Sequence, residues 1–257
     1  MTATADAPAA AETAPQVLRS RFVQYLCLKT DPLWRRLPAD VRARGRAEFA
    51  EVIGKAAPDV TTDAYSTLGL KVSAELLLWW KADDPEPVQE TLSALLQTGL
   101  GQYCEVTHAL FGLTRPSIYT KRRSAQEQAL DEPERLKYLV VYPFSKTVEW
   151  YLMTREARQG LMNEHMRVGH EFADVRQVLL YATGLDDQEF IVAYETDRLE
   201  RHQQLVIDLR STESRRYTLR DTPIFTAIHR PSRKQPCQGQ RLGRAEDSRA
   251  FYRLGAA

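Results

Sequence analysis

Two reactive side chains stand four residues apart near the middle of the chain, in the stretch YLVVYPFSKTVEWYLM (residues 138–153). Tyr142 ends an apolar, β-branched run, Pro143 follows it, and Lys146 lies in the turn beyond. A phenol can lose an electron and a proton, and a partly desolvated ammonium can hold a carboxylate or exchange protons with it. Because we expect the chain to bend at Pro143, the Tyr142 hydroxyl and the Lys146 ammonium can both reach one acidic group of a ligand. Without such a ligand, the same residues are only a strand-end turn.

A histidine further along the chain is a candidate metal ligand. His165 lies on the apolar face of a helix predicted over residues 154–172, a position where histidine is more often a core residue. Gly169, one turn later, leaves room for a flat group, and Glu164 and Glu213 are carboxylates that can orient the imidazole through its free N–H. The sequence contains no zinc-like spacing of ligands, so a lone axial imidazole suits haem iron better.

Composition excludes several classes of protein. The 257 residues contain 35 Lys and Arg against 34 Asp and Glu, so the net charge is close to zero. It does not favour nucleic acid or an anionic membrane as a partner. The apolar run LLLWW (residues 76–80) is too short to span a bilayer, and the N-terminus lacks the pattern of a signal peptide. Three scattered cysteines favour a reduced, cytoplasmic setting: Cys27, Cys104 and Cys237.

Hydrophobic patterns predict two units with the same order of elements. In the first unit we expect a strand, a helix, two strands bent at Gly69 and a helix, at residues 22–29, 39–55, 60–80 and 86–99. The segment 101–135 has no clear pattern. In the second unit we expect a strand, an aromatic second strand, a helix, two strands, a helix and a last strand, at residues 138–144, 147–153, 154–172, 175–183, 189–195, 196–210 and 222–228.

The order strand, helix, two strands, helix, strand is that of a ferredoxin-like unit. Two such units predict an α+β fold in which two ferredoxin-like βαββαβ repeats form a dimeric α+β barrel within one chain. The expected boundaries are a disordered lead (1–18), an N-terminal half (19–135), a C-terminal half carrying the candidate site (136–230), and a basic, flexible tail (231–257).

Three motifs carry a resemblance to a known family: the YPFSK turn followed by Glu-Trp, the Glu-His pair on the helix, and TGLDD between two strands. Over residues 136–229 the chain resembles the chlorite dismutase superfamily, and within it the bacterial coproheme decarboxylases. The resemblance implies a haem-dependent oxidative decarboxylase that converts coproheme III to haem b with hydrogen peroxide through a tyrosyl radical. The iron porphyrin would then be both substrate and cofactor. A homo-oligomer, commonly a pentamer, is implied as well.

The resemblance also assigns roles to single residues. His165 matches the axial ligand of the iron, Tyr142 the tyrosine that becomes a radical, and Lys146 the lysine that assists at the propionate being lost. Trp150 falls where family members place an aromatic residue near the porphyrin. Gln177 matches the distal position, where chlorite-degrading members have arginine, and this difference favours decarboxylation.

Several assignments stay open at the level of sequence. The neighbouring Arg176 would be the distal residue if the strand register shifted by one, since such a slip turns a side chain to the opposite face. Arg215 and Arg216 are either anchors for other propionates, which guanidinium groups bind in a bidentate manner, or residues of a solvated strand edge. Tyr119 is a candidate for the lining of the same pocket.

Other functions also remain open. One is a chlorite dismutase-like haem peroxidase acting on another substrate, and another is a non-catalytic haem-binding protein. A third is a cofactor-free monooxygenase of the ferredoxin-like dimeric-barrel type. Fold alone does not decide among them.

Overall fold

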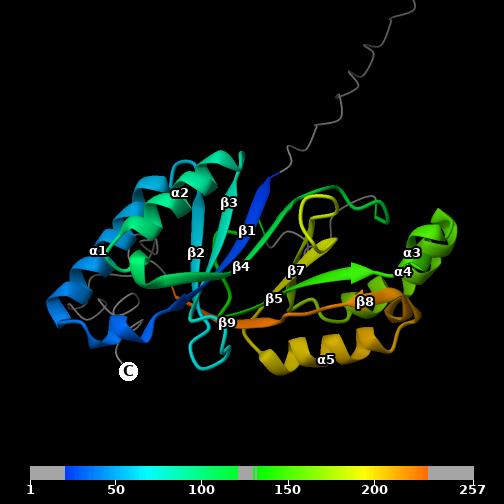
Figure 1. Cartoon of the computed structure of the whole chain (residues 1–257). Coiled ribbons are helices and arrows are strands. Elements are labelled where there is room, and N and C mark those ends of the chain that lie inside the picture. Colours follow the sequence, from blue (N-terminus) through cyan, green and yellow to red (C-terminus); the bar gives the residue numbers. More distant parts are fainter. Residues whose placement is uncertain (1–20, 121–129, 131, 231–257) are drawn as a thin grey trace, which may run out of the picture.

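The computed structural model describes residues 21–120, 130 and 132–230 (Figure 1). The predicted lead, the predicted basic tail and Cys237 therefore lie outside the described residues. Within the described part, no helix is long and apolar enough to cross a membrane.

The first unit has the predicted order of elements, completed by a last strand. Its elements are β1 (Phe22–Thr30), α1 (Ala39–Ala56), β2 (Thr61–Ser66), β3 (Leu76–Ala82), α2 (Glu86–Gln97) and β4 (Cys104–Leu113), with short 3₁₀ helices at Pro32–Arg36 and Gly101–Tyr103. The chain turns between β2 and β3 at Gly69, which has φ of +78°, a value that glycine adopts without strain. Strand β4 lies in the segment that had no clear pattern, because most of its residues are half-buried or exposed without strict alternation.

The second unit repeats this order. Its elements are β5 (Tyr138–Lys146), α3 (Val148–Leu152), α4 (Arg155–His170), β6 (Arg176–Tyr181), β7 (Phe190–Thr196), α5 (Leu199–Arg210), a 3₁₀ helix (Glu213–Tyr217), β8 (Thr218–Arg220) and β9 (Phe225–His229). The strands of the two units run in equivalent orders, β4-β1-β3-β2 and β6-β7-β5-β9. Two ferredoxin-like repeats are therefore present, as predicted.

The prediction of a second aromatic strand at residues 147–153 is wrong. Residues 148–152 form the short helix α3, in which Trp150 is buried while Val148 and Leu152 are exposed. Aromatic and β-branched residues suggested a strand, but a five-residue segment is too short for its period to be read from sequence. One large side chain, packed between Tyr119 and Tyr217, decides the local conformation.

The two units close into a barrel through narrow seams. Strands β4 and β6 pair at Leu113 and Tyr181, and β2 and β9 pair at two positions, Tyr65 with His229 and Ser66 with Ile228. The pairing of β5 with β7 completes the ring, and β8 extends from β5 outside it. The barrel interior is filled with apolar side chains, which include Tyr25, Leu77, Trp79, Leu139, Leu180 and Phe225.

The two helical layers differ in how well they are packed. Helices α1 and α2 cover one side of the barrel, and α4 and α5 cover the other (Figure 1). Between the first pair and the sheet lies a continuous core that includes Trp34, Phe49, Trp80 and Leu95. Below α4 and α5 the core is much smaller, and none of the residues of α4 is fully buried. The space that the first unit fills with side chains is thus partly open in the second.

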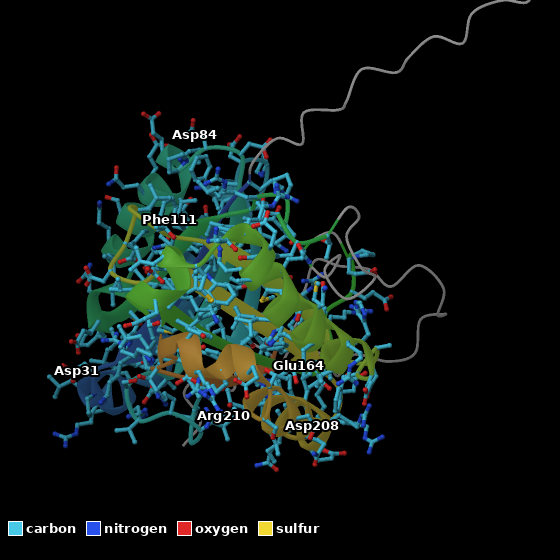
Figure 2. All side chains as sticks on the ribbon, turned by 90° about the vertical axis from the view of Figure 1, so that its right-hand side faces the viewer. Asp31, Asp84, Phe111, Glu164, Asp208 and Arg210 are labelled. Carbon is cyan, nitrogen blue, oxygen red and sulfur yellow. The ribbon has the colours of Figure 1, made fainter. Side chains whose placement is uncertain are left out.

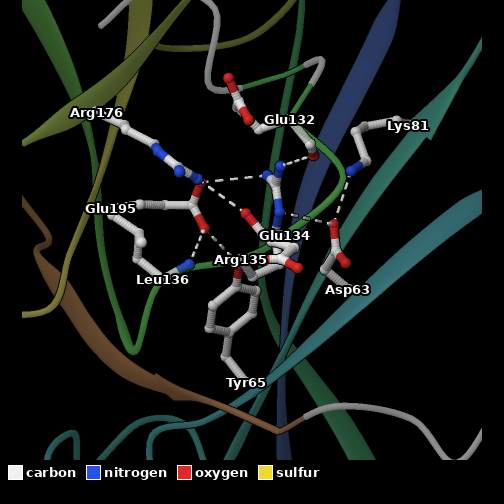
Figure 3. Close-up of polar contacts among 9 residues, drawn as sticks. All are labelled: Asp63, Tyr65, Lys81, Glu132, Glu134, Arg135, Leu136, Arg176 and Glu195. Carbon is white, nitrogen blue, oxygen red and sulfur yellow. Dashed lines mark hydrogen bonds and ion pairs between the residues drawn. The ribbon is translucent and has the colours of Figure 1, made fainter. Parts of the chain in front are cut away.

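A buried cluster of charged side chains joins the two units inside the described part of the barrel (Figure 3). Asp63 and Lys81 come from the first unit and form an ion pair at 2.7 Å. Arg135, in the segment before β5, pairs with Glu195 of β7 in the second unit at 3.2 Å, each with 2% of its side chain exposed. Arg135 also lies 4.0 Å from Asp63, and the Tyr65 hydroxyl donates to Glu195 at 3.3 Å. Both units therefore contribute to one desolvated network.

Candidate functional site

A cavity of about 730 Å³ lies between the sheet of the second unit and helices α4 and α5. Its volume falls within the range of small-molecule and cofactor sites. Figure 2 looks onto this side of the molecule, where Glu164 marks α4 and Arg210 marks α5. The cavity occupies the gap that the smaller core of the second unit leaves open.

Alternate residues of three neighbouring strands form the sheet wall of the cavity, since successive side chains of a strand point to opposite faces. The wall residues that alternate along β5, β6 and β7 are Tyr142, Phe144, Lys146, Gln177, Leu179, Tyr181, Phe190, Val192 and Tyr194, and Val178 of β6 also borders the cavity. Gln177 pairs directly with Tyr194, and Arg176 pairs with Glu195 on the opposite face. Arg176 donates to the Glu134 carbonyl at 2.8 Å, near the buried charge cluster. The register thus places Gln177, and not Arg176, in the cavity.

His165 lines the helical wall of the cavity. Its Nδ1 lies 3.3 Å from the Ser214 hydroxyl oxygen, to which it donates when the ring proton is on Nδ1. The expected carboxylate partners are engaged elsewhere: Glu164 accepts a hydrogen bond from the Glu213 backbone at 3.0 Å, and Glu213 pairs with Arg216 at 3.0 Å. The expectation that Glu164 or Glu213 orients the imidazole is corrected to Ser214, because the 3₁₀ helix after α5 turns the serine inward.

The environment keeps His165 neutral. Burial lowers the pKa of this imidazole to about 4, and the ammonium of Lys146 adds to the shift. No residue in the described part of the chain hydrogen bonds to Nε2. A neutral imidazole with Nδ1 held and Nε2 free is the form that coordinates a metal ion. At Gly169, one turn further along α4, a Cβ would have no atom within 4 Å other than those of its chain neighbours and its own helix backbone, so the space beside it is open.

Lys146 lies at the end of β5, between polar and aromatic groups. Its ammonium donates to the Thr218 hydroxyl at 3.3 Å and lies 4.6 Å from the ring centroid of Trp150. Burial lowers the pKa of Lys146 to about 8, and the positive charge of Arg215 contributes. The backbone N–H of Lys146 donates to the Glu189 carboxylate at 2.6 Å, which holds this end of the strand in place. Lys146 can therefore titrate near neutral pH, and an acidic group of a ligand would stabilise its protonated form.

Tyr142 and Tyr194 form a pair of phenols in the sheet wall. Their ring centroids are 6.2 Å apart, so the two rings lie side by side in the same wall. Burial raises the pKa of the Tyr142 phenol, so it is neutral at physiological pH. Tyr194 was missed by the sequence analysis, although the alternation of EFIVAYE placed it on the same face as Val192. Tyr119 lines the cavity too and packs against Trp150, with centroids 6.4 Å apart.

The charges that line the cavity are mainly positive. Its cations are Arg115, Lys146, Arg158, Arg210 and Arg215, and Asp221 is the carboxylate that the described lining contains. Arg215 therefore lies in the cavity wall, where it pairs with Asp221 at 2.7 Å. Arg216 is not among the lining residues and pairs with Glu213 outside. The arrangement favours a ligand with several acidic groups.

The donor groups fit an iron porphyrin better than a metal ion held by side chains alone. Among the described residues, no group of three or more His, Cys, Asp or Glu side chains could hold a metal ion. A single free imidazole nitrogen suits a metal that arrives with its other ligands, as the iron of a porphyrin does. His165 would hold the iron, and the cationic side chains would face the acid groups of the macrocycle.

The fold and the site define a class of proteins: barrels of two ferredoxin-like repeats with a cavity lined by cationic side chains and by two histidines, the half-buried His165 and the exposed His170. The chain belongs to the chlorite dismutase family, whose family model matches residues 42–230. Among its relatives is the coproheme decarboxylase of Mycolicibacterium smegmatis, 35% identical over 168 residues, which cover 65% of this chain and 72% of that protein. The chlorite dismutase of Ideonella dechloratans is 28% identical over 209 residues, 77% of this chain and 72% of that protein.

Solved structures agree with this membership. Chlorite dismutase from Candidatus Nitrospira defluvii, in complex with imidazole, has a TM-score of 0.75 at 27% identity and covers 82% of this chain and 91% of its own. A haem-binding protein from Thermus thermophilus has a TM-score of 0.74 at 21% identity and covers 82% and 92%, which shows the shared fold alone.

Proposed function

We propose that this protein is a hydrogen peroxide-dependent coproheme decarboxylase, which converts coproheme III to haem b through a radical on Tyr142. The observation that carries the proposal is the presence of His165, Tyr142 and Lys146 in one cavity. A neutral imidazole, an oxidisable phenol and a titratable cation are the groups that such chemistry requires. The relationship to the coproheme decarboxylase of M. smegmatis supports the same choice.

Each turnover removes one propionate carboxyl group. The propionate, one hydrogen peroxide and one proton give a vinyl group, carbon dioxide and two water molecules. The bound iron porphyrin supplies peroxide-dependent oxidation and also carries the propionates. Tyr142 would give up an electron and a proton, and its phenoxyl radical would then take a hydrogen atom from the propionate β-carbon. A second one-electron oxidation accompanies the loss of carbon dioxide.

The remaining residues position the reacting groups. Lys146 would hold the reacting carboxylate beside Tyr142, since the two residues are four positions apart on β5 and both side chains line the cavity. Ser214 would hold the imidazole of His165 so that Nε2 faces the ligand. Gln177, a neutral amide, would face the distal side, and Trp150 would pack near the porphyrin and against the Lys146 ammonium.

The direct test is to mix purified protein with coproheme III, add hydrogen peroxide in steps and analyse the porphyrins by mass spectrometry. We expect successive loss of two carboxyl groups, with a monovinyl intermediate between coproheme III and haem b. An unchanged porphyrin would contradict the proposal and leave a haem-binding protein. Oxygen release from chlorite by the haem-loaded protein, without decarboxylation, would favour chlorite dismutase chemistry instead.

Lys146 gives the binding step a specific pH dependence. We expect the affinity for iron-free coproporphyrin III to fall as pH rises through about 8, because the ammonium that attracts the carboxylates loses its proton there. Lys146→Arg should remove this dependence between pH 7 and pH 9, because guanidinium stays protonated. Fluorescence titrations at several pH values measure it. An equal decline in both proteins would exclude Lys146 as the titrating group.

A further inference from the structure

Some cationic side chains around the cavity are already compensated by other groups of the protein, and others are not. Only an uncompensated cation offers its full charge to the acid groups of a ligand. Arg210 and Arg215 share Asp221, at 3.3 Å and 2.7 Å, so a carboxylate inside the protein already compensates both guanidinium groups. Lys146 is held by Thr218 and has a lowered pKa. These residues offer a ligand less positive charge than their number suggests.

Arg158 differs from these residues, because no described side chain forms an ion pair with it. Arg115, the remaining cation of the lining, is exposed and lies over the Tyr181 ring, 5.9 Å from its centroid. Arg158 lies in the first turns of α4 and lines the cavity, and its Nε is buried without a hydrogen-bond partner among the described residues. Burial raises the pKa of the Tyr119 and Tyr151 phenols, and the positive charge of Arg158 opposes that rise in both. The guanidinium therefore lies close to two aromatic residues of the cavity rim.

The position of Arg158 does not favour the helix itself. A positive side chain near the N-terminus of a helix opposes the helix dipole, whose positive end lies there. A buried guanidinium N–H without an acceptor is also unfavourable. Both effects would be relieved by an anionic group of a ligand bound in the cavity.

The rim beside Arg158 is held in place by its neighbours on α4. Arg155 donates to the Ile118 carbonyl at 3.3 Å, and Gln159 donates to the Tyr119 carbonyl at 3.2 Å. The segment 117–120 is thereby attached to the first two turns of the helix. Arg158, between these two residues in sequence, is left to face the cavity.

We propose that Arg158 is the carboxylate anchor at the rim of the cavity and binds a propionate of the tetrapyrrole through its free Nε–H and its charge. This inference rests on the proposed function and adds to it a binding residue outside the sheet wall. Arg158 would hold one acid arm on the helix side while Lys146 holds another beside Tyr142. A ligand with acid groups on several sides would then be preferred over one with fewer.

The test measures binding of iron-free coproporphyrin III by fluorescence, without peroxide. Arg158→Gln should weaken binding about ten- to hundredfold, the effect of losing a charge-assisted hydrogen bond. Arg158→Lys should restore part of the affinity because it keeps the charge. Arg167→Gln is the matched control: it removes the same charge from the same helix, but Arg167 is exposed and pairs with Glu171 at 3.4 Å. We expect that variant to bind like the wild type.

Three outcomes would overturn the anchor: wild-type affinity in Arg158→Gln, no recovery in Arg158→Lys when both variants have wild-type circular dichroism, or no porphyrin binding by the wild type. The assay needs neither iron nor turnover. A wild-type protein that binds coproporphyrin through Arg158 but decarboxylates nothing would refute the proposed reaction alone. Normal decarboxylation with unchanged binding by Arg158→Gln would refute the anchor alone.

Discussion

Tyr142→Phe should bind coproheme III like the wild type and yield, on peroxide titration, less than about one hundredth of the vinyl product. A hundredfold loss corresponds to only ~2.7 kcal/mol of transition-state stabilisation, and losing the radical-forming group should remove more than that. Phenylalanine keeps the ring that packs in the wall but has no O–H to oxidise. The rings of Tyr142 and Tyr194 remain in contact, and removing one buried hydroxyl group costs about 1–3 kcal/mol at most. The fold should therefore survive.

The measurement is product analysis by mass spectrometry, with the absorption spectrum of the bound porphyrin as a check on binding. Tyr138→Phe is a suitable control, since Tyr138 lies on β5 with its side chain on the same face but is not among the residues that line the cavity. Equal product from Tyr142→Phe and the wild type would reject the radical assignment. An altered porphyrin spectrum in the variant would instead indicate that Tyr142 acts in binding.

Arg135→Gln should destabilise the protein by about 3–5 kcal/mol, the usual result of removing one partner of a buried ion pair. Arg135 faces Glu195 at 3.2 Å and Asp63 at 4.0 Å, with only 2% of its side chain exposed. Without the guanidinium, two carboxylates of the cluster in Figure 3 lose a shared cation. The loss affects both units of the barrel, because Asp63 belongs to β2 and Glu195 to β7.

The effect of Arg135→Gln should grow with pH. Burial already raises the pKa of Glu195 to about 7 while Arg135 opposes that shift, so removing Arg135 should raise this pKa further. A carboxyl group whose pKa is higher in the folded than in the unfolded state destabilises the fold as pH rises. The variant should therefore lose more stability at pH 8 than at pH 6, where Glu195 can remain protonated.

Urea unfolding at the two pH values measures the change in the free energy of unfolding. Arg201→Gln is the control, because Arg201 pairs with Asp174 at 3.1 Å near the surface, and such pairs contribute about 0–1 kcal/mol. Adding Glu195→Gln to Arg135→Gln should recover part of the loss, since the pair is coupled. A loss of less than about 1 kcal/mol in Arg135→Gln at pH 8 would show that the cluster does not stabilise the barrel.

The sequence by itself determined the repeated order of elements and the residues that could do chemistry. Apolar periodicity is a local property, so the long helices α1, α2, α4 and α5 and most strands were predictable. The sequence also placed Tyr142 at the end of an apolar strand and Lys146 in the turn after it, whereas strand β5 runs on to Lys146. Helix α3 was mistaken for a strand because its conformation depends on the packing of Trp150 and not on a period.

Only the tertiary structure decided which of these residues meet. The choice between Gln177 and Arg176 depended on the pairing of β6 with β7, and Ser214 became the partner of His165 through the turn after α5. Arg158 belongs to no sequence motif, and the alternation that places Tyr194 on the same face as Val192 does not show that this face lines a cavity. Contacts between residues distant in sequence depend on strand register and on how helices cover a sheet, and neither is encoded in a local pattern. The open space below α4 likewise exists because packing there is incomplete, which follows from the whole fold.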